Sequence, residues 1–280
     1  MRGANTFEFS PRRLPPIESF GRAGDAGATA HYADPAYYAR AYRRRRRDVD
    51  FYLELGRSTR GPVLEYGTGN GRVALPLARA GVVITGVDRS RPMLRDFERR
   101  LEHEPPAVRR RVRLVRADMR AHRSSRRYAL VIAPFNTLLH LYTRRDLERF
   151  LAAVRRHLAT GGRFVFDCSM PRPEELCGRV RAARPRRLWH AGRRAWVDYS
   201  ESFEYDPERQ LLLIWLRFEP RGEEPTARRA FAVPLTHRQF FPRELESELH
   251  YAGFRDIRIG VNFGEAPDGR APETLLVECR

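Results

Sequence analysis

Short apolar runs alternate with helical stretches along the middle of the chain. Each run is rich in β-branched residues and as short as a strand buried in a parallel sheet. The stretches between the runs repeat their apolar positions at helical spacing. The predicted strands are Val63–Glu65, Val82–Val87, Val112–Val115, Tyr128–Ala133 and Arg163–Cys168, with helices at Arg72–Ala80, Pro92–His103 and Arg144–Leu158. This alternation predicts an α/β fold built on a doubly wound parallel sheet.

The pattern changes after Met170. A proline-rich segment leads into Trp196–Tyr205, where apolar and polar residues alternate with the period of a half-buried strand. Similar runs at Leu211–Glu219 and Arg228–Leu235 predict a small antiparallel β-sheet in this region. The chain then returns to the main sheet with a helix and two strands, predicted at Arg243–Ala252, near Ile257–Val261 and at Thr274–Glu278. These two strands bring the predicted main sheet to seven.

We therefore expect three regions. Residues 1–30, rich in Gly, Pro, Ala and Arg, form a mobile arm. Residues 31–170 and 240–280 form the main α/β domain, whose first predicted helix, Pro35–Leu55, contains the run Arg43–Arg47. Residues 171–239 form the inserted antiparallel sheet. Ligands bind open α/β sheets at the carboxyl ends of the strands, and we expect the insert to cover that edge as a lid.

The segment VLEYGTGNGR, Val63–Arg72, carries the most specific local pattern. Glu65 precedes a turn that contains Gly67, Thr68 and Gly69, and a third glycine follows at position 71. Glycines allow a sharp turn and a close approach of backbone to ligand. A dinucleotide fingerprint would need glycine at position 72, where this chain has arginine. The turn therefore does not match a dinucleotide-binding site, and an ordinary strand–helix turn is the alternative to another ligand.

A second carboxylate, Asp88, ends the next predicted strand. An acceptor-only side chain at this strand tip can receive both hydroxyls of a ribose. Asp88 could instead cap the next helix, but Ser90 ahead of Pro92 is expected to fill that role. Asp118-Met119 follows the third predicted strand, where Asp118 could also cap a short helix.

Together these residues resemble the class I S-adenosylmethionine (SAM) methyltransferases, whose first motif has the form E-x-G-x-G-x-G. The resemblance implies a seven-stranded Rossmann-like sheet and SAM as cofactor. It implies that Asp88 binds the ribose, that Asp118 accepts from the adenine amino group, and that the backbone of Met119 supports the ring. Met93 would lie beside the adenine. The other implied cofactor contacts are Glu65, Gly67, Thr68, Gly69, Arg89, Ala133 and Phe135.

The segment after the fourth predicted strand, Ala133–Leu141, reads APFNTLLHL. It lacks the [D/N]-P-P-[F/Y] tetrapeptide of enzymes that methylate amino groups of nucleic acids. It also lacks the carboxylates with which catechol O-methyltransferases hold magnesium, so no metal is expected. It resembles the N-S-x-x-H-L sequence of glycine N-methyltransferases and bacterial amino-sugar N-methyltransferases. His31–Asp34 and Thr236–Phe240 extend this resemblance to about residues 31–280.

The resemblance to these N-methyltransferases suggests roles for three further residues. Arg43 would bind the SAM carboxylate, although any arginine of Arg43–Arg47 could take that place. His140 would act as the base beside the methyl group, since imidazole can take a proton near neutral pH. Tyr32 would orient the acceptor or close over the sulfonium. A structural role for His140 remains the alternative.

The charge of the chain invites a comparison with nucleic-acid-binding proteins. Its formal net charge is +18, and all 53 of its Lys and Arg residues are arginine. Selection for phosphate binding alone would not exclude lysine, so the bias is typical of a GC-rich coding sequence and disfavours a nucleic-acid partner. Three cysteines without metal-ligand spacing indicate a reducing, cytoplasmic compartment. No signal peptide and no membrane span is expected.

The sequence thus predicts a SAM-dependent methyltransferase that acts on an amine or hydroxyl of a small-molecule metabolite. Methyl transfer from a sulfonium is an in-line displacement that depends on positioning. An RNA methyltransferase and a non-catalytic SAM-binding protein remain alternatives, as does an enzyme that transfers the aminopropyl carbon. The acceptor, the attacked atom and the oligomeric state stay open.

Overall fold

The chain forms two compact units in a computed structural model that describes residues 7–8, 27, 29–177, 179–181, 185–220, 230–264 and 271–280. One unit comprises the described residues of Met1–Arg43 and Pro171–Gln239. The other comprises those of Arg44–Met170 and Phe240–Arg280. Most of the expected N-terminal arm lies outside the described residues, but Phe7–Glu8 form a short strand, β1.

The larger unit contains a seven-stranded sheet, which confirms the predicted fold class. Its strands are β2 (Val63–Tyr66), β3 (Ile84–Asp88), β4 (Val112–Arg116), β5 (Tyr128–Ala133), β6 (Leu158–Ser169), β12 (Arg258–Val261) and β13 (Thr274–Cys279). They lie in the order β12-β13-β6-β5-β2-β3-β4. Strands β4, β3, β2, β5 and β6 are parallel, whereas β13 runs antiparallel to both of its neighbours. Five parallel strands therefore present their carboxyl ends at one edge.

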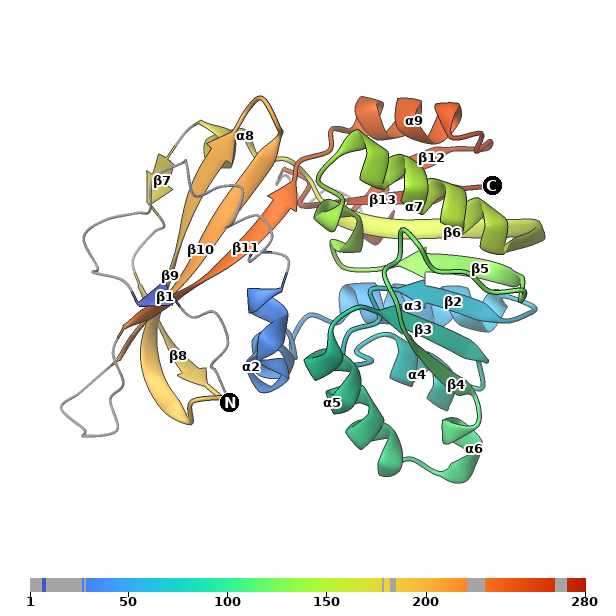
Figure 1. The fold of residues 1–280 in the computed structure, drawn as a ribbon, viewed down its shortest axis with the longest axis horizontal. Helices are drawn as coiled ribbons and strands as arrows, with labels where there is room; N and C mark the ends of the chain where they lie inside the picture. Colours follow the sequence, from blue (N-terminus) through green and yellow to red (C-terminus); the bar gives the residue numbers. More distant parts are fainter. Residues whose placement is uncertain are drawn as a thin grey trace. The chain divides into compact units, whose positions relative to one another are not determined.

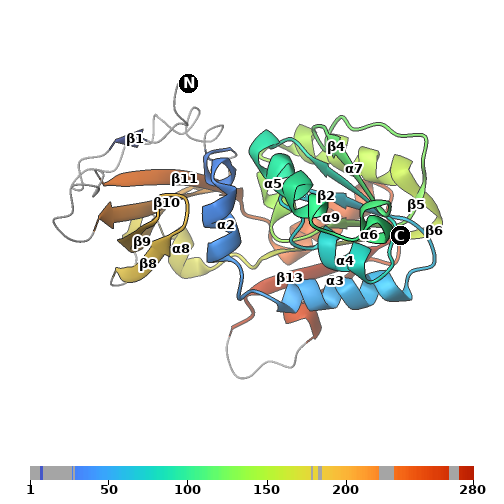
Figure 2. The same ribbon diagram turned by 90° about the horizontal axis from the view of Figure 1, so that it is seen from below.

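Helices cover both faces of this sheet (Figures 1 and 2). The helical elements of the unit are α3 (Arg47–Ser58), α4 (Ala74–Arg79), α5 (Arg91–Glu102), α6 (Pro106–Arg109), η3 (Thr137–His140), α7 (Arg144–His157), α9 (Pro242–Tyr251) and η4 (Asn262–Gly264). Helices α3, α4 and α5 bury apolar residues on one face, and α7 and α9 bury theirs on the other. The sheet is doubly wound, as the alternating pattern predicts.

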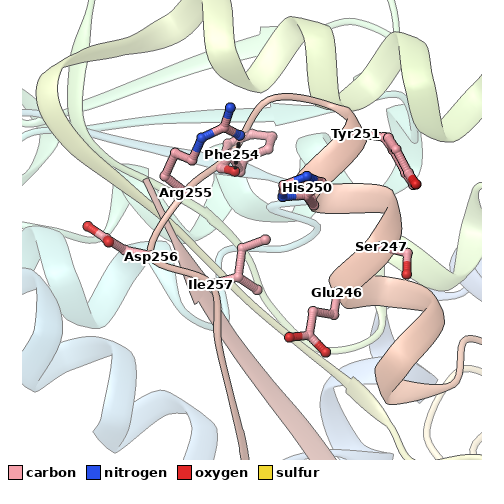
Figure 3. Close-up of a pocket in the computed structure, with 8 residues that line it drawn as sticks. All are labelled: Glu246, Ser247, His250, Tyr251, Phe254, Arg255, Asp256 and Ile257. Atoms are coloured by element: carbon pink, nitrogen blue, oxygen red, sulfur yellow. Dashed lines mark hydrogen bonds between the residues drawn. The ribbon is translucent and has the colours of Figure 1, made fainter.

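The C-terminal end of α9 borders a surface hollow of about 390 Å³ (Figure 3). The hollow is lined by Glu246, Ser247, His250, Tyr251, Phe254, Arg255, Asp256 and Ile257. These residues belong to α9 and to the loop that leads into β12. None of them is a predicted site residue, so the predicted site lies elsewhere in the unit.

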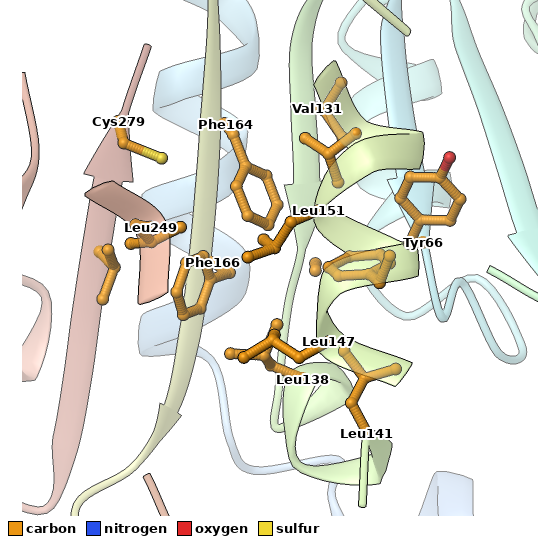
Figure 4. Close-up of a cluster of buried hydrophobic side chains, with 14 of the residues drawn as sticks. Tyr66, Val131, Leu138, Leu141, Leu147, Leu151, Phe164, Phe166, Leu249 and Cys279 are labelled. Carbon is orange, nitrogen blue, oxygen red and sulfur yellow. The ribbon is translucent and has the colours of Figure 1, made fainter. Parts of the chain in front are cut away.

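The core beneath α7 and α9 is built from aromatic and branched side chains (Figure 4). Phe164 and Phe166 on β6 stack with ring centroids 5.0 Å apart. Leu147 and Leu151 of α7 and Leu249 of α9 join the same buried cluster. Alternate residues of β6 point to the opposite face, where Val165 packs in the second cluster. Burial on both faces explains why the central parallel strands β2, β3 and β5 have nearly continuous apolar sequences.

The predicted helix Pro35–Leu55 is wrong in its continuity. The chain forms α2 over Pro35–Ala41 and α3 over Arg47–Ser58, with a break between them. Arg43–Arg46 lie in this break instead of inside a helix, and Arg47 is the first residue of α3. Like charges three and four positions apart disfavour helix, whereas Asp48 and Asp50 in the first turn of α3 favour a start there.

The smaller unit contains a six-stranded antiparallel sheet formed within the described residues. Its other strands are β7 (Arg179–Arg181), β8 (Arg186–His190), β9 (Ala195–Asp206), β10 (Leu211–Pro220) and β11 (Phe231–Arg238), and its helical elements are η2 (Ala30–Ala33), α2 and α8 (Pro173–Leu176). The order β1-β11-β10-β9-β7 places β8 on β9 as well. The antiparallel insert is therefore present.

Residues 31–43, which we expected in the main domain, belong to the smaller unit. Tyr37 of α2 stacks on His190 of β8, with ring centroids 4.8 Å apart. Tyr37 also meets Phe218 of β10 edge to face at 5.2 Å. Burial of these rings against the sheet holds residues 31–43 in the smaller unit.

Candidate active site

The glycine turn follows β2 directly and folds back on β3. Gly67, Gly69 and Gly71 have φ angles of +67°, +55° and +80°. A Cβ on Gly71 would lie 2.4 Å from the buried ring of Phe97, so no side chain fits there. The amide groups of Gly67 and Thr68 both donate to the carbonyl of Val87, at 2.8 and 3.2 Å. These two N–H groups are therefore hydrogen-bonded within the fold, and the turn does not form a phosphate-binding site.

Glu65 lies beneath this turn and is 2% exposed. The hydroxyl of Thr68 donates to Glu65 Oε2 at 3.0 Å. Burial raises the pKa of Glu65 to about 8. The side chain is thus mostly protonated at neutral pH and supports the turn from below.

Asp88, at the end of β3, joins the glycine turn to the next helix. Its Oδ2 accepts from the amide of Gly69 at 2.7 Å, and its Oδ1 accepts from the amide of Ser90 at 2.7 Å. Burial raises its pKa. Ser90 stands at the N-cap position of α5, as predicted, but its side chain makes no capping hydrogen bond to the helix. The Asp88 carboxylate itself orders the entry to α5.

Two further predicted residues flank Asp88. Met93 of α5 is buried, and its Cε lies 3.1 Å from where a Cβ on Gly69 would stand. Arg89 is exposed directly after β3. Met93 therefore contacts the glycine turn, and Arg89 lies beside Asp88 in contact with solvent.

Asp118 follows β4, and Arg120 holds it. The Arg120 side chain donates through Nε and Nη2 to the Asp118 carboxylate, at distances from 2.6 to 3.1 Å. Arg120 also reaches Asp146 of α7, with Nη1 2.6 Å from Oδ1. The Arg120 guanidinium lowers the pKa of Asp118. The amide of Arg120 donates to Asp118 Oδ1 at 2.9 Å, so Asp118 also orders the local turn, and Met119 lies half-buried within it.

A strained turn follows β5, immediately after buried Ala133. Phe135 and Asn136 have φ angles of +53° and +65°, in the left-handed region that costs an ordinary residue about 1–2 kcal/mol. The end of β6 holds this turn in place. Asp167 accepts from the amide of Phe135 at 2.9 Å, and Asn136 Oδ1 accepts from the amide of Ser169 at 2.7 Å.

Two arginines lie over the Phe135 ring. The guanidinium carbons of Arg45 and Arg72 stand 4.8 and 4.6 Å from its centroid. Arg72, at the position where a dinucleotide fingerprint has glycine, forms a bidentate pair with buried Asp48. Arg45 has a looser contact with Asp48, with Nε 3.8 Å from Oδ2. Arg45 thus comes to the carboxyl ends of the parallel strands.

His140 ends η3, the short helix after this turn. Its Nδ1 lies 3.4 Å from the hydroxyl of Tyr142, and its ring is half-buried. Thr137, at the start of η3, packs against the glycine turn, since a Cβ on Gly67 would lie 2.4 Å from Thr137 Oγ1. The helix that carries His140 is therefore seated on that turn.

Tyr32 and Arg43 lie in the smaller unit. Tyr32 is half-buried and meets the His31 ring edge to face at 5.2 Å. Arg43 is exposed after α2. The structure thus gathers the other predicted residues in the larger unit and leaves these two with the inserted sheet.

The sequence predictions missed four polar residues of this edge, namely Asp48, Tyr52, Arg120 and Asp167. Asp48 and Tyr52 lie on the buried face of α3. A charged residue within the apolar run FVFDCS was the available signal for Asp167. Buried charge in a central strand is rare without a role.

Comparison with known proteins agrees with this geometry. Residues 63–162 match the family model for a methyltransferase domain. The chain resembles the CcbJ methyltransferase from Streptomyces caelestis, with 23% identity, a TM-score of 0.73, and coverage of 90% of this chain and 98% of that one. It also resembles the glycopeptide N-methyltransferase MtfA complexed with SAM, with 26% identity, a TM-score of 0.58, and coverage of 83% and 86%. No curated protein sequence matches significantly.

Residues 63–162 are a class I SAM-dependent methyltransferase domain. A third structure, DesVI from Streptomyces venezuelae, extends the likeness of fold over 95% of this chain and 99% of its own, at 18% identity and a TM-score of 0.60. MtfA has also been crystallised with S-adenosylhomocysteine (SAH) and with sinefungin. The cofactor is SAM.

The methyltransferase site suits this cofactor chemically. A turn whose amides are already satisfied offers no nest for phosphate, and SAM carries none. Asp88 is a carboxylate placed beside the turn, and a carboxylate can accept hydrogen bonds from hydroxyl groups. Within the described residues, no three His, Cys, Asp or Glu side chains group as metal ligands. The helices that the structure describes include none with the length and apolar character of a membrane span.

Proposed function

We propose that this methyltransferase moves the SAM methyl group to an amine or hydroxyl of a small-molecule metabolite, by direct in-line displacement without a metal. The contact between Gly67 and Thr137 carries the proposal. It seats η3, and with it His140, against the turn that binds the cofactor. The attacking amine or hydroxyl must lose a proton during the transfer, and a base beside the reacting methyl group can accept it.

The cofactor contacts follow from the positions at the strand ends. Asp88 accepts the ribose hydroxyls, and the turn of Gly67, Thr68 and Gly69 passes beneath the cofactor, with Glu65 as its support. Met93 and Met119 flank the adenine. Arg89 closes its outer side, and Asp118 accepts its amino group once Arg120 yields one of the oxygens it holds.

The arginine for the SAM carboxylate is better assigned to Arg45 than to Arg43. Arg45 stands over Phe135 at the carboxyl ends of the strands, whereas Arg43 belongs to the smaller unit. Asp48 holds Arg72 in a bidentate pair and Arg45 only loosely, so Arg45 is the guanidinium better able to take a ligand carboxylate. The backbones of Ala133 and Phe135 then border the methyl-bearing end.

His140 takes the acceptor proton. For this, its Nδ1 carries hydrogen and donates to Tyr142, which leaves the lone pair on Nε2 as the base. When bound, SAM supplies an electrophilic methyl carbon on a positively charged sulfur. The strained Phe135–Asn136 turn fixes the distance between this carbon and η3, and positioning of this kind supplies much of the acceleration. Tyr32, which belongs to the smaller unit, is our candidate for the residue that orients the acceptor.

The acceptor class rests on two observations. MtfA, a glycopeptide N-methyltransferase, shares 26% of its residues over most of both chains, which favours an amine on a small natural product. The segment after β5 lacks the tetrapeptide of nucleic-acid amino methylation.

Labelled SAM tests the proposal. The purified protein is incubated with methyl-tritiated SAM and, separately, with a small-metabolite extract and with total RNA. Label in the metabolite fraction supports the proposed function. Label in RNA would overturn the acceptor class, and label in neither, despite measurable SAM binding, would indicate a binding protein. SAM carrying carbon-14 in the aminopropyl chain separates methyl from aminopropyl transfer.

A further inference from the structure

A buried carboxylate at the end of β6 lacks an ion-pair partner among the residues that the structure describes. The Asp167 side chain is 1% exposed. Its Oδ1 accepts two hydrogen bonds, from the hydroxyl of Tyr52 at 2.8 Å and from the amide of Phe135 at 2.9 Å. Its Oδ2 is buried and finds no hydrogen-bond partner among the described residues.

The other acidic residues at this edge are ion-paired, protonated or hydrogen-bonded at both carboxylate oxygens. Asp48 is paired with Arg72, and Asp118 is paired with Arg120. Glu65 is largely protonated at neutral pH, because burial raises its pKa to about 8. Asp88 takes two backbone amides. Asp167 forms no ion pair with any residue that the structure describes, although the charge of Arg45 acts on it through space and lowers its pKa.

An uncompensated buried carboxylate is costly, so a fold keeps one where a ligand supplies the missing charge. The bond from Phe135 to Asp167 brings the carboxylate to the turn after β5. Under the proposed function, that turn borders the methyl-bearing sulfur. SAM carries a positive charge on this sulfur, and the product SAH carries none.

We propose that Asp167 is the counter-charge for the sulfonium and makes the site prefer the cationic methyl donor to the neutral product. This inference rests on the proposed function. Asp167 acts through space, from beneath the Phe135–Asn136 turn, and contacts neither the acceptor nor the transferred group. The preference disappears at the moment of transfer, when the sulfur loses its charge, and so assists product release.

The test compares two ligands that differ in this charge. Sinefungin carries a protonated amine where SAM has its methylated sulfur, and SAH is neutral there. Dissociation constants for both are measured by calorimetry at pH 7.5 for the wild type, for Asp167→Asn and for Glu278→Gln. Glu278, paired with Arg163, is a matched carboxylate on β13, two strand positions from Asp167 in the register of β6 and β13.

In Asp167→Asn we expect sinefungin to bind about tenfold more weakly while SAH affinity stays within twofold, as one through-space charge interaction at intermediate dielectric predicts. Glu278→Gln should leave the ratio of the two constants unchanged. Equal weakening of both ligands in Asp167→Asn would show that Asp167 only holds the fold, and would overturn the proposal. If the wild type binds neither ligand, the cofactor site itself is wrong, and the proposed function fails with it.

A second measurement needs no substitution. Burial raises the pKa of Asp167 to about 6, so its charge is lost as the pH falls from 7 to 5. The wild-type preference for sinefungin over SAH should decline over this range by more than the preference of Asp167→Asn does. A flat wild-type profile would contradict the proposal.

Other groups face Asp167, and they do not produce the same dependence of ligand preference on pH. Burial raises the pKa of Tyr52 and of Cys168 well above neutrality, so both stay uncharged. Arg45 stays positive, and Asp48 remains within its pair with Arg72. Glu65 titrates near pH 8, above the range used.

Discussion

The backbone amide of Gly69 donates to Asp88 Oδ2 at 2.7 Å, which joins the glycine turn to the tip of the adjacent strand. The two residues are 19 positions apart in the chain, yet they form one surface. Because Ser90 occupies the other oxygen of the same carboxylate, the orientation of Asp88 is fixed before any ligand arrives.

Replacement of Asp88 by Asn should weaken SAH binding about 10- to 100-fold, because a charged acceptor for two hydroxyls is lost. Calorimetry measures the change directly, without catalysis. Glu104→Gln, which breaks an ion pair with Arg79 elsewhere in the same unit, serves as the control. Unchanged SAH affinity in Asp88→Asn would remove Asp88 from the cofactor site.

The assignment of Arg45 over Arg43 can be checked by matched substitutions. Arg45→Ala should raise the dissociation constant of SAH about tenfold or more, since a charge-assisted bond to its carboxylate is lost. Arg43→Ala, which removes the same side chain two positions earlier, should change it less than twofold. Thermal unfolding of both variants shows whether loss of the Arg45 contact with Phe135 affects folding. The opposite order of effects would return the role to Arg43.

His140→Ala should lower kcat about 100-fold or more while SAH affinity remains nearly unchanged, because proton transfer by a positioned base contributes at least that much. Single-turnover rates with the identified acceptor provide the measurement. Tyr142→Phe removes only the partner of Nδ1 and should have a smaller effect on kcat. Loss of SAH binding in His140→Ala would assign this residue to the fold or the cofactor pocket instead.

The smaller unit should lose stability in mild acid. Burial lowers the pKa of His31 to about 4 and that of His237 to about 3, from an ordinary value of 6.5. Below about pH 6.5 the unfolded chain binds protons that the folded unit refuses, so stability is full above this pH and falls toward pH 4. For His31 alone the loss is about 2 kcal/mol at pH 5.

Urea unfolding at pH 7.5 and pH 5.0 measures this loss. The chain has three tryptophans, Trp189, Trp196 and Trp215, and all lie in the smaller unit, so their fluorescence reports on it alone. His31→Gln should reduce the difference between the two pH values. His103→Gln, at an exposed position after α5, should retain it. An equal difference in His31→Gln would show that His31 does not carry the effect.

Much of the sheet could be predicted from sequence because its central strands β2, β3 and β5 are buried on both faces, and so their sequences are mainly apolar. The exceptions have local causes. The break between α2 and α3 depends on repulsion within the arginine run, which hydrophobic periodicity does not register. The alternation of the insert predicted its antiparallel sheet, but the packing of Tyr37 on His190 joins residues far apart in sequence.

In the candidate site, too, some residues could be predicted from the sequence and others could not. The glycine turn and Asp88 could be predicted because their role lies in spacing along the chain. Arg45 could not be distinguished from Arg43, since nothing within a run of five arginines indicates which of them reaches the site. Asp167 and Asp48 were missed because their significance lies in whether a partner neutralises them, and Arg72 settles that for Asp48 only in three dimensions.

The chain passes between the two units at residues 43–44, 170–171 and 239–240, so the smaller unit is assembled from two separate stretches of sequence. Recombination between relatives that exchanged residues 171–239 alone would leave α2 packed on a foreign sheet. Tyr37 would then lose its partners His190 and Phe218. An engineered chimera must therefore move the described part of residues 29–43 together with the insert, and natural variation in these two stretches is expected to be correlated.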